Sequence, residues 1–311
     1  MQKTFILKII AFSGIIIVIL TLCLLFLPDK KSANSIFGAF PAKHLLLSAS
    51  ASPKIIFVGG SSTSMGINSK MVADSFHMPV VNNGLSGFLG LQFIIDDVEP
   101  YINKGDVVVL MSEYTAYENT PDNEFTGHEE LLPVLFSILP AEKKYVNSDQ
   151  WLQLSKFLPH YTFSKIKQVF YNPPDGMYNK NAFNNYGDFT AHWGQANMIV
   201  KPQEQCKGDE EVQPDLIPFL KSFQKYISDK GARLYILPPP LQATSFTNQA
   251  FIIDKISIAF KKAGLPLIAK PIEYKMDDQY FFDYCYHLDK KGVEMHTERI
   301  IRDLAKVIKK N

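Results

Sequence analysis

The N-terminal segment places the strongest constraint on how this chain folds, because no charged residue occurs between Ile9 and Leu27. About 20 such apolar residues are needed to cross the hydrocarbon core of a bilayer as a helix. A signal sequence is the alternative, but its apolar region is shorter, about 7–15 residues, and ends near small residues. Here a Leu-Pro-Asp-Lys-Lys segment follows directly. The sequence therefore favours an uncleaved membrane anchor over residues 1–31, inserted through residues 9–27.

Composition narrows the function of the remaining chain. Of its 311 residues, 46% are apolar, and the formal net charge is +1, so there is material for a large core but no basic excess that would suggest nucleic acid. Only three cysteines occur, at positions 23, 206 and 285. They are too few for a disulfide scaffold or a thiolate metal site. We therefore expect no bound metal, and because the dinucleotide fingerprint GxGxxG is also absent we expect no cofactor.

Short apolar runs that end at turns alternate with helical patterns. The runs are Ile55–Val58, Val80–Val81, Val107–Met111 and Leu234–Leu237, and helices are predicted over 69–76, 216–230, 251–263 and from about 290. Repeated strand, turn and helix is typical of a parallel sheet covered by helices. The sequence predicts an α/β domain over 54–311.

Two further segments complete the expected domain organisation. Residues 32–53 are polar and rich in small residues, which predicts a tether between anchor and domain. Between about 120 and 214 the strand and helix pattern gives way to aromatics, Asn and Pro. An irregular insertion of this length is more often a lid or a binding surface than a spare linker.

The first strand delivers a serine to a tight turn, in the sequence IIFVGGSSTSMG. A side chain at the carboxyl end of a buried parallel strand lies where open α/β sheets bind their ligands. A phosphate-binding Walker loop is excluded, because no lysine follows Gly66. Two interpretations of Ser61 stay open, a nucleophile and a plain connection between strand and helix.

A nucleophilic serine needs a base, and the segment FFDYCYHLD provides one. An imidazole must take the serine proton, and a carboxylate must fix its tautomer and stabilise its charged form. Asp283 and His287 lie four residues apart, close enough for one short loop to hold both. The alternative is a structural histidine at the start of a helix, for which Asp289 is the expected N-cap.

These residues resemble the SGNH or GDSL hydrolase superfamily. The chain is most similar to its membrane-anchored branch, which includes alginate acetylation proteins and the D-alanyl transfer protein of teichoic acids. Gly59-Gly60-Ser61 stands where the superfamily has Gly-Asp-Ser, and Gly84 matches its oxyanion glycine. Asp283 and His287 match its terminal block. The resemblance covers about residues 54–118 and 231–305.

The resemblance implies a flavodoxin-like three-layer α/β/α fold with a parallel five-stranded sheet. It implies Ser61 as nucleophile, His287 as general base and Asp283 as its orienting carboxylate, with the Ser61 and Gly84 amides as oxyanion donors. The implied chemistry is acyl-ester transfer or hydrolysis, with O-acetyl groups on a cell-surface polysaccharide as substrate. A membrane-bound O-acyltransferase is an implied partner, and the domain is expected outside the cytoplasmic membrane.

One block departs from the family pattern. The superfamily ends its third strand in a motif whose asparagine donates to the oxyanion, whereas this chain has Met111-Ser112-Glu113. The loss of one such donor can cost roughly 10²–10³ in turnover. Either another donor such as Asn83 substitutes, or the domain is a catalytically silent glycan-binding or scaffold subunit. Glu113 is in either case a candidate ligand for a sugar hydroxyl.

An aromatic and amide cluster lies in the insertion. Its members are Tyr178, Asn181, Phe183, Asn185, Tyr186, Asp188, His192 and Trp193. Rings stacked on sugars, with amides on hydroxyls, would make a carbohydrate surface, and Tyr186, Asp188 and Trp193 are its main candidates. The alternative is a lid that packs its own aromatics on the sheet.

Overall fold

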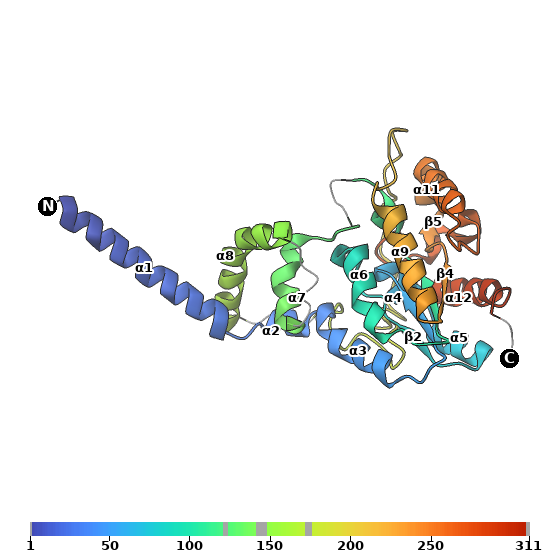
Figure 1. Ribbon diagram of the computed structural model, residues 1–311, viewed down its shortest axis with the longest axis horizontal. Helices are drawn as coiled ribbons and strands as arrows, with labels where there is room; N and C mark the ends of the chain where they lie inside the picture. Colours follow the sequence, from blue (N-terminus) through green and yellow to red (C-terminus); the bar gives the residue numbers. More distant parts are fainter. Residues whose placement is uncertain (1, 121–123, 141–147, 172–175, 309–311) are drawn as a thin grey trace. The chain divides into compact units, whose positions relative to one another are not determined.

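A computed structural model describes residues 2–120, 124–140, 148–171 and 176–308 (Figure 1). The chain forms two compact units. We call the first the anchor unit, Met1–Gly38 with Glu129–Lys180, and the second the α/β unit, Ala39–His128 with Asn181–Asn311. Each unit therefore combines segments that lie far apart in the sequence.

A parallel sheet forms the centre of the α/β unit. Its order is β2 (Val80–Asn82), β1 (Ile55–Val58), β3 (Val107–Leu110) and β4 (Arg233–Ile236). Ile55 pairs with Val80 on one side and with Val107 on the other. All residues of β1 and β3 are buried, as expected of strands covered on both faces. The predicted mixed α/β architecture with a parallel sheet is confirmed.

The sheet has four strands, and the expectation of five is wrong in this respect. Beside β4, where a fifth strand would pair, Leu267 forms only an isolated parallel bridge with Ile236. Pro266 precedes this bridge and Pro271 follows it, and proline has no N–H to donate to a ladder. A separate two-stranded parallel sheet pairs β5 (Leu241–Gln242) with β6 (Lys275–Met276).

Helices cover both faces of the four-stranded sheet. Phe57 and Val109 pack in one cluster with residues of α5 (Ser69–Phe76) and α12 (Lys290–Leu304). Alternate strand residues point to the other face, and there α6 (Leu91–Val98) contacts β1 and α9 (Leu216–Asp229) contacts β4. The remaining helices of this unit are α3 (Phe40–Ala49), α4 (Ser61–Gly66), α10 (Ala243–Asn248) and α11 (Ala250–Ala263).

The anchor unit is helical. It contains α1 (Gln2–Phe26), α2 (Lys30–Asn34), α7 (Leu132–Ile138) and α8 (Ser148–Phe170). Among the described residues α1 is the one helix that is long and apolar enough to cross a membrane. Its apolar side chains are exposed along its length, so α1 does not serve as a core helix of this unit.

The segments expected as tether and insertion have more structure than predicted. Within 32–53, the helix α3 belongs to the α/β unit. It buries one of its faces, which carries Phe40 and Leu47. Only the short stretch after Ala49 is without a helix. Of the insertion, residues 129–180 join the N-terminal segment in the anchor unit. Sequence periodicity missed this because the two segments that pack together are separated by about 90 residues.

Candidate active site

Close backbone approach explains the two glycines that precede Ser61. A Cβ on Gly59 would lie 2.1 Å from the carbonyl oxygen of Met111, and a Cβ on Gly60 would lie 2.3 Å from Oε2 of Glu113. Both distances are far below contact, so larger residues would force the turn apart. Gly60 is the N-cap of α4, and Ser61 is the first residue of that helix. Because Ser61 follows shortly after Val58, the last residue of β1, it lies at the carboxyl edge of the sheet.

The structure brings Ser61, His287 and Asp283 together. The Ser61 Oγ lies 2.8 Å from Nε2 of His287, and Nδ1 of His287 lies 2.8 Å from Oδ1 of Asp283. The carboxylate accepts at Nδ1, which leaves Nε2 unprotonated in the neutral ring and able to accept the serine proton. The His287 and Asp283 side chains are 12% and 17% exposed. A substrate can therefore reach a chain of groups that is otherwise enclosed.

A tight loop holds the acid and the base. The Phe282 amide donates to the His287 carbonyl over 2.8 Å, and the His287 amide donates to the Tyr284 carbonyl over 2.9 Å. Asp289 then caps α12 by accepting from the Gly292 amide over 2.7 Å, as predicted. These bonds close the loop between two fixed points, so the imidazole has a defined direction toward Ser61.

The neighbouring thiol does not compete as a nucleophile. Cys285 is fully buried. Burial raises the pKa of the Cys285 thiol to about 12, so it stays protonated near neutral pH. Ser61 is partly exposed. Among the described residues no cluster of three His, Cys, Asp or Glu side chains is suited to a metal ion.

Glu113 lies directly against the serine. The residue is buried, with 2% of its surface exposed. Its Oε1 accepts from the Ser62 amide over 2.6 Å and lies 3.2 Å from the Ser61 Oγ. The single hydroxyl hydrogen of Ser61 thus has two acceptors, Glu113 and His287. The arrangement supplies a base in the expected place, but it also puts a carboxylate beside the reacting oxygen.

The two residues that were expected to donate to an oxyanion, Gly84 and Asn83, have hydrogen-bonding surroundings that the sequence did not predict. The Gly84 amide donates to Oδ1 of Asn82 over 3.0 Å, so an oxyanion could bind there only if this hydrogen bond broke. Asn83 is buried, and its Oδ1 has no hydrogen-bond partner among the described residues.

Sequence reasoning missed Gly87. A Cβ on Gly60 would lie 2.7 Å from the Gly87 nitrogen, which places the Gly87 amide at the turn before Ser61. The second glycine of the NNGLSG motif was the available signal. The Gly87 amide therefore lies beside the turn that precedes Ser61, whereas the family resemblance pointed to Gly84 in this segment.

The aromatic and amide cluster favours packing over sugar binding at its centre. Asp188 is fully buried. It accepts from the Ser69 amide, the Ser69 hydroxyl, Asn82 and Asn184 at 2.5–3.0 Å. Tyr186 and Trp193 are partly buried against core clusters. Asp188 has no capacity left for a sugar hydroxyl, whereas Tyr186 and Trp193 keep part of their surface.

In comparisons with known proteins, no family model matches the chain and no curated protein is significantly similar to it in sequence.

Proposed function

We propose that the α/β unit is a serine-dependent acyl-ester transferase or hydrolase that acts on O-acetyl groups of an extracytoplasmic polysaccharide. The continuous hydrogen-bonded chain from Ser61 through His287 to Asp283 carries the proposal. The resemblance to the membrane-anchored SGNH branch, with its five-stranded fold and polysaccharide substrates, supplies the substrate class.

The proposed chemistry proceeds in two steps. The Ser61 oxygen attacks the ester carbonyl while His287 takes its proton, and collapse of the tetrahedral intermediate gives an acyl-serine and a free alcohol, which receives that proton. Water or a sugar hydroxyl then attacks the acyl-serine while His287 takes its proton, and the Ser61 oxygen leaves and receives that proton from His287. Asp283 stabilises the charged imidazole in both steps.

Glu113 bears on how the proposed oxyanion would be stabilised. The Ser61 amide and the amides of Gly84 or Gly87 are the candidate donors, and preorganised donors of this kind often contribute the largest single part of catalysis. A carboxylate beside them opposes the developing negative charge. The bonds from Glu113 to Ser62 and Ser61 therefore favour a second candidate, a catalytically silent glycan-binding or scaffold subunit of a membrane-bound acyltransferase system.

A fluorophosphonate separates the two candidates. We expect the full chain in detergent to form a phosphonyl adduct on Ser61 and to hydrolyse an aryl acetate. Ser61→Ala should abolish both, whereas the matched variant Ser62→Ala should be labelled normally, because the Ser62 hydroxyl has no hydrogen-bond partner among the described residues. If wild-type protein neither forms the adduct nor exceeds the Ser61→Ala background, the scaffold function replaces the enzyme.

Access of protease tests the proposed location. A polymer-modifying domain must lie outside the cytoplasmic membrane, although lysines on both sides of the apolar segment 9–27 give only a slight positive-inside bias. Protease added to intact spheroplasts should digest the α/β unit. Full protection in spheroplasts, with digestion after lysis, would place the domain in the cytoplasm.

A further inference from the structure

One face of α8 exposes large apolar side chains among the residues that the structure describes. Leu152, Phe163 and Phe170 are 68%, 55% and 85% exposed. Their spacings of 11 and 7 residues correspond to about three and two helical turns, so they lie on one side of α8, which contains Pro159 between Leu152 and Phe163. Lys156 and Lys167 are exposed one turn beyond Leu152 and Phe163. We call this set of three apolar and two basic side chains the α8 stripe.

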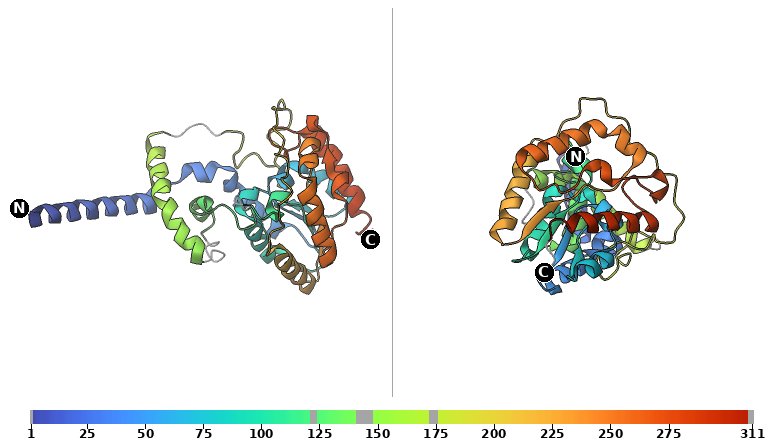
Figure 2. Two further views of the ribbon diagram at one scale, coloured as in Figure 1. Left: turned by 90° about the horizontal axis from the view of Figure 1, so that it is seen from above. Right: turned by 90° about the vertical axis from the view of Figure 1, so that its right-hand side faces the viewer.

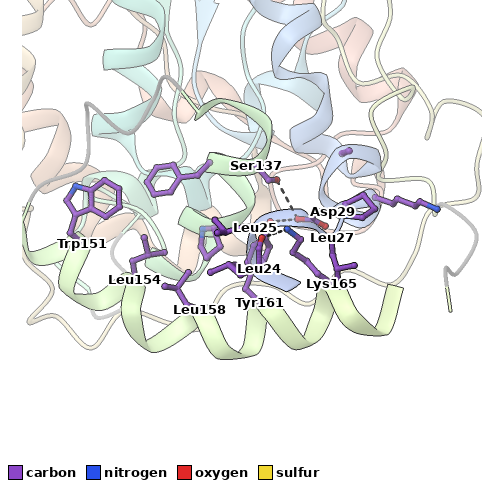
Figure 3. A pocket seen from close by; sticks show the side chains of 15 residues that line it. Leu24, Leu25, Leu27, Asp29, Ser137, Trp151, Leu154, Leu158, Tyr161 and Lys165 are labelled. Carbon is purple, nitrogen blue, oxygen red and sulfur yellow. Dashed lines mark hydrogen bonds between the residues drawn. The ribbon is translucent and has the colours of Figure 1, made fainter. Parts of the chain in front are cut away.

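The opposite face of α8 packs against the end of α1. Figure 3 shows Leu154, Leu158, Tyr161 and Lys165 pointing toward the residues that follow Leu24. The Lys165 ammonium donates to the Leu24 carbonyl over 2.6 Å, which satisfies a carbonyl in the last turn of α1. These contacts fix α8 to the C-terminal end of the helix that is long enough to cross a membrane.

The direction of α8 fits a helix that lies on a surface. In Figures 1 and 2 the part of α8 next to the end of α1 runs across the α1 axis. If α1 crosses a bilayer, its last turn lies where the chain leaves the hydrocarbon core, and a helix across that point runs along the interface. An amphipathic helix with Phe and Leu on one side and Lys at its edge is typical of this location.

We propose that α8 binds the bilayer surface at the leaflet where α1 ends, with Leu152, Phe163 and Phe170 among the acyl chains. Lys167 then meets lipid phosphates, since long basic side chains extend toward the headgroup region. The proposal rests on α1 crossing the membrane and not on the chemistry at Ser61. Continuity with α1 is what selects lipid over a protein partner as the occupant of the α8 stripe.

A tryptophan on α8 can report the proposed contact between this helix and lipid. It has two tryptophans. Trp151 lies on α8, stacked on Phe136 with ring centroids 5.4 Å apart, and Trp193 lies in the α/β unit against a buried cluster. Trp193→Phe leaves Trp151 as the single fluorophore, and Trp151→Phe leaves Trp193 as the matched control.

The experiment is depth-dependent quenching in vesicles of phosphatidylcholine brominated at acyl carbons 6 and 7 or 11 and 12. We expect Trp151 fluorescence to fall about twofold or more, and further with the shallow bromines, because interfacial helices insert roughly 5–10 Å. Trp193 should be quenched little. Flotation of the same samples reports insertion of α1 separately, so a chain that fails to float tests α1 and not α8.

Variants of the α8 stripe decide the outcome. Phe163→Glu with Phe170→Glu should return Trp151 quenching to the Trp193 level without changing flotation, because charged side chains are expelled from the acyl region. Phe163→Leu with Phe170→Leu should stay quenched. Phe251→Glu with Ile258→Glu, at exposed positions of α11, is the matched charge control. Unchanged quenching in the α8 glutamate pair would overturn the proposal and indicate a protein partner. So would equal quenching of Trp151 and Trp193 in the two floating single-tryptophan variants with an intact α8 stripe.

Discussion

The two units of this chain treat large apolar side chains in opposite ways. In the α/β unit Phe57 is fully buried at the centre of the sheet, whereas in the anchor unit Phe163 and Phe170 on α8 are mostly exposed. Removal of apolar surface from water is the main favourable contribution to folding. The difference teaches that the α/β unit carries its own core, while large apolar side chains of α1 and α8 stay exposed among the described residues of the anchor unit.

Buried polar groups differ between the units as well. In the anchor unit Asp29 accepts hydrogen bonds from the Ser32 amide, the Tyr161 hydroxyl and the Gln168 side-chain amide. These bonds tie a helix start to α8. In the α/β unit the hydrogen-bonded chain from Asp283 through His287 ends instead at the partly exposed Ser61. Polar groups thus attach one helix to another in the anchor unit, whereas we propose that this chain serves catalysis in the α/β unit.

The largest expected effect tests whether Asp283 and His287 act together. Asp283→Asn should present the wrong imidazole tautomer and lower turnover of an aryl ester by up to about 10⁴-fold, as known for this change in a triad. His287→Ala should reduce activity to the Ser61→Ala background. Because groups that act as a unit are non-additive, the double variant should be scarcely worse than His287→Ala.

Activity must be expressed per folded molecule, measured by circular dichroism of each variant. If both residues only support the fold, the double variant loses stability and its activity falls with the folded fraction. Full activity per folded molecule in His287→Ala would reduce Ser61 to a turn residue after a buried strand.

The contrast in burial predicts unequal responses to the same truncation. Phe57→Ala should destabilise the α/β unit by about 3–5 kcal/mol through lost burial and a cavity. Phe163→Ala should change the stability of the detergent-solubilised chain by no more than about 0.5 kcal/mol. Urea unfolding followed by tryptophan fluorescence measures both. A large loss of stability in detergent from Phe163→Ala would mean that the α8 stripe is covered by protein.

Acid should weaken the α/β unit through His296. This side chain is fully buried, its Nδ1 lies 2.6 Å from the Gly66 carbonyl, and burial lowers its pKa to about 4. The unfolded chain binds the proton with a pKa near 6.5. Unfolding is therefore favoured as pH falls from about 6.5 to 4, by on the order of 2 kcal/mol at pH 5.

The matched variant for this effect is His296→Asn, whose amide can donate to the Gly66 carbonyl but does not titrate. Urea midpoints followed through Trp193 in a Trp151→Phe background report the α/β unit alone. The difference between pH 7 and pH 5 should be smaller in His296→Asn than in the parent. Equal differences would assign the acid sensitivity to other groups.

The sequence predicted the regular part of the α/β unit well, because local patterns determine it. The strand Ile55–Val58 and the helix Ser69–Phe76 stand where periodicity and turn residues placed them. Asp283 and His287 were predictable as a pair because one short loop holds both. Their distance to Ser61 was not, since it depends on packing between segments more than 200 residues apart.

The sequence predicted the anchor unit poorly beyond α1. Its composition suggested an irregular tether and insertion, and nothing local indicates that residues 129–180 pack with the N-terminus. Glu113 is an intermediate case. Its position after β3 was evident, but the bond to the Ser62 amide depends on how closely the Gly60 turn approaches.

The smallest predicted effect, a gain in activity, follows from Glu113. In Glu113→Gln the side-chain oxygen can still accept from the Ser62 amide, while the NH₂ group replaces the oxygen that lies against Gly60 and adds a donor near Ser61. Because one oxyanion donor contributes roughly 10²–10³ at an optimal position, partial recovery should raise aryl acetate turnover about tenfold. Glu113→Ala removes the charge without adding a donor, so its gain should be smaller. A fall in activity in Glu113→Gln, at unchanged stability, would instead show that the carboxylate itself takes part in substrate binding.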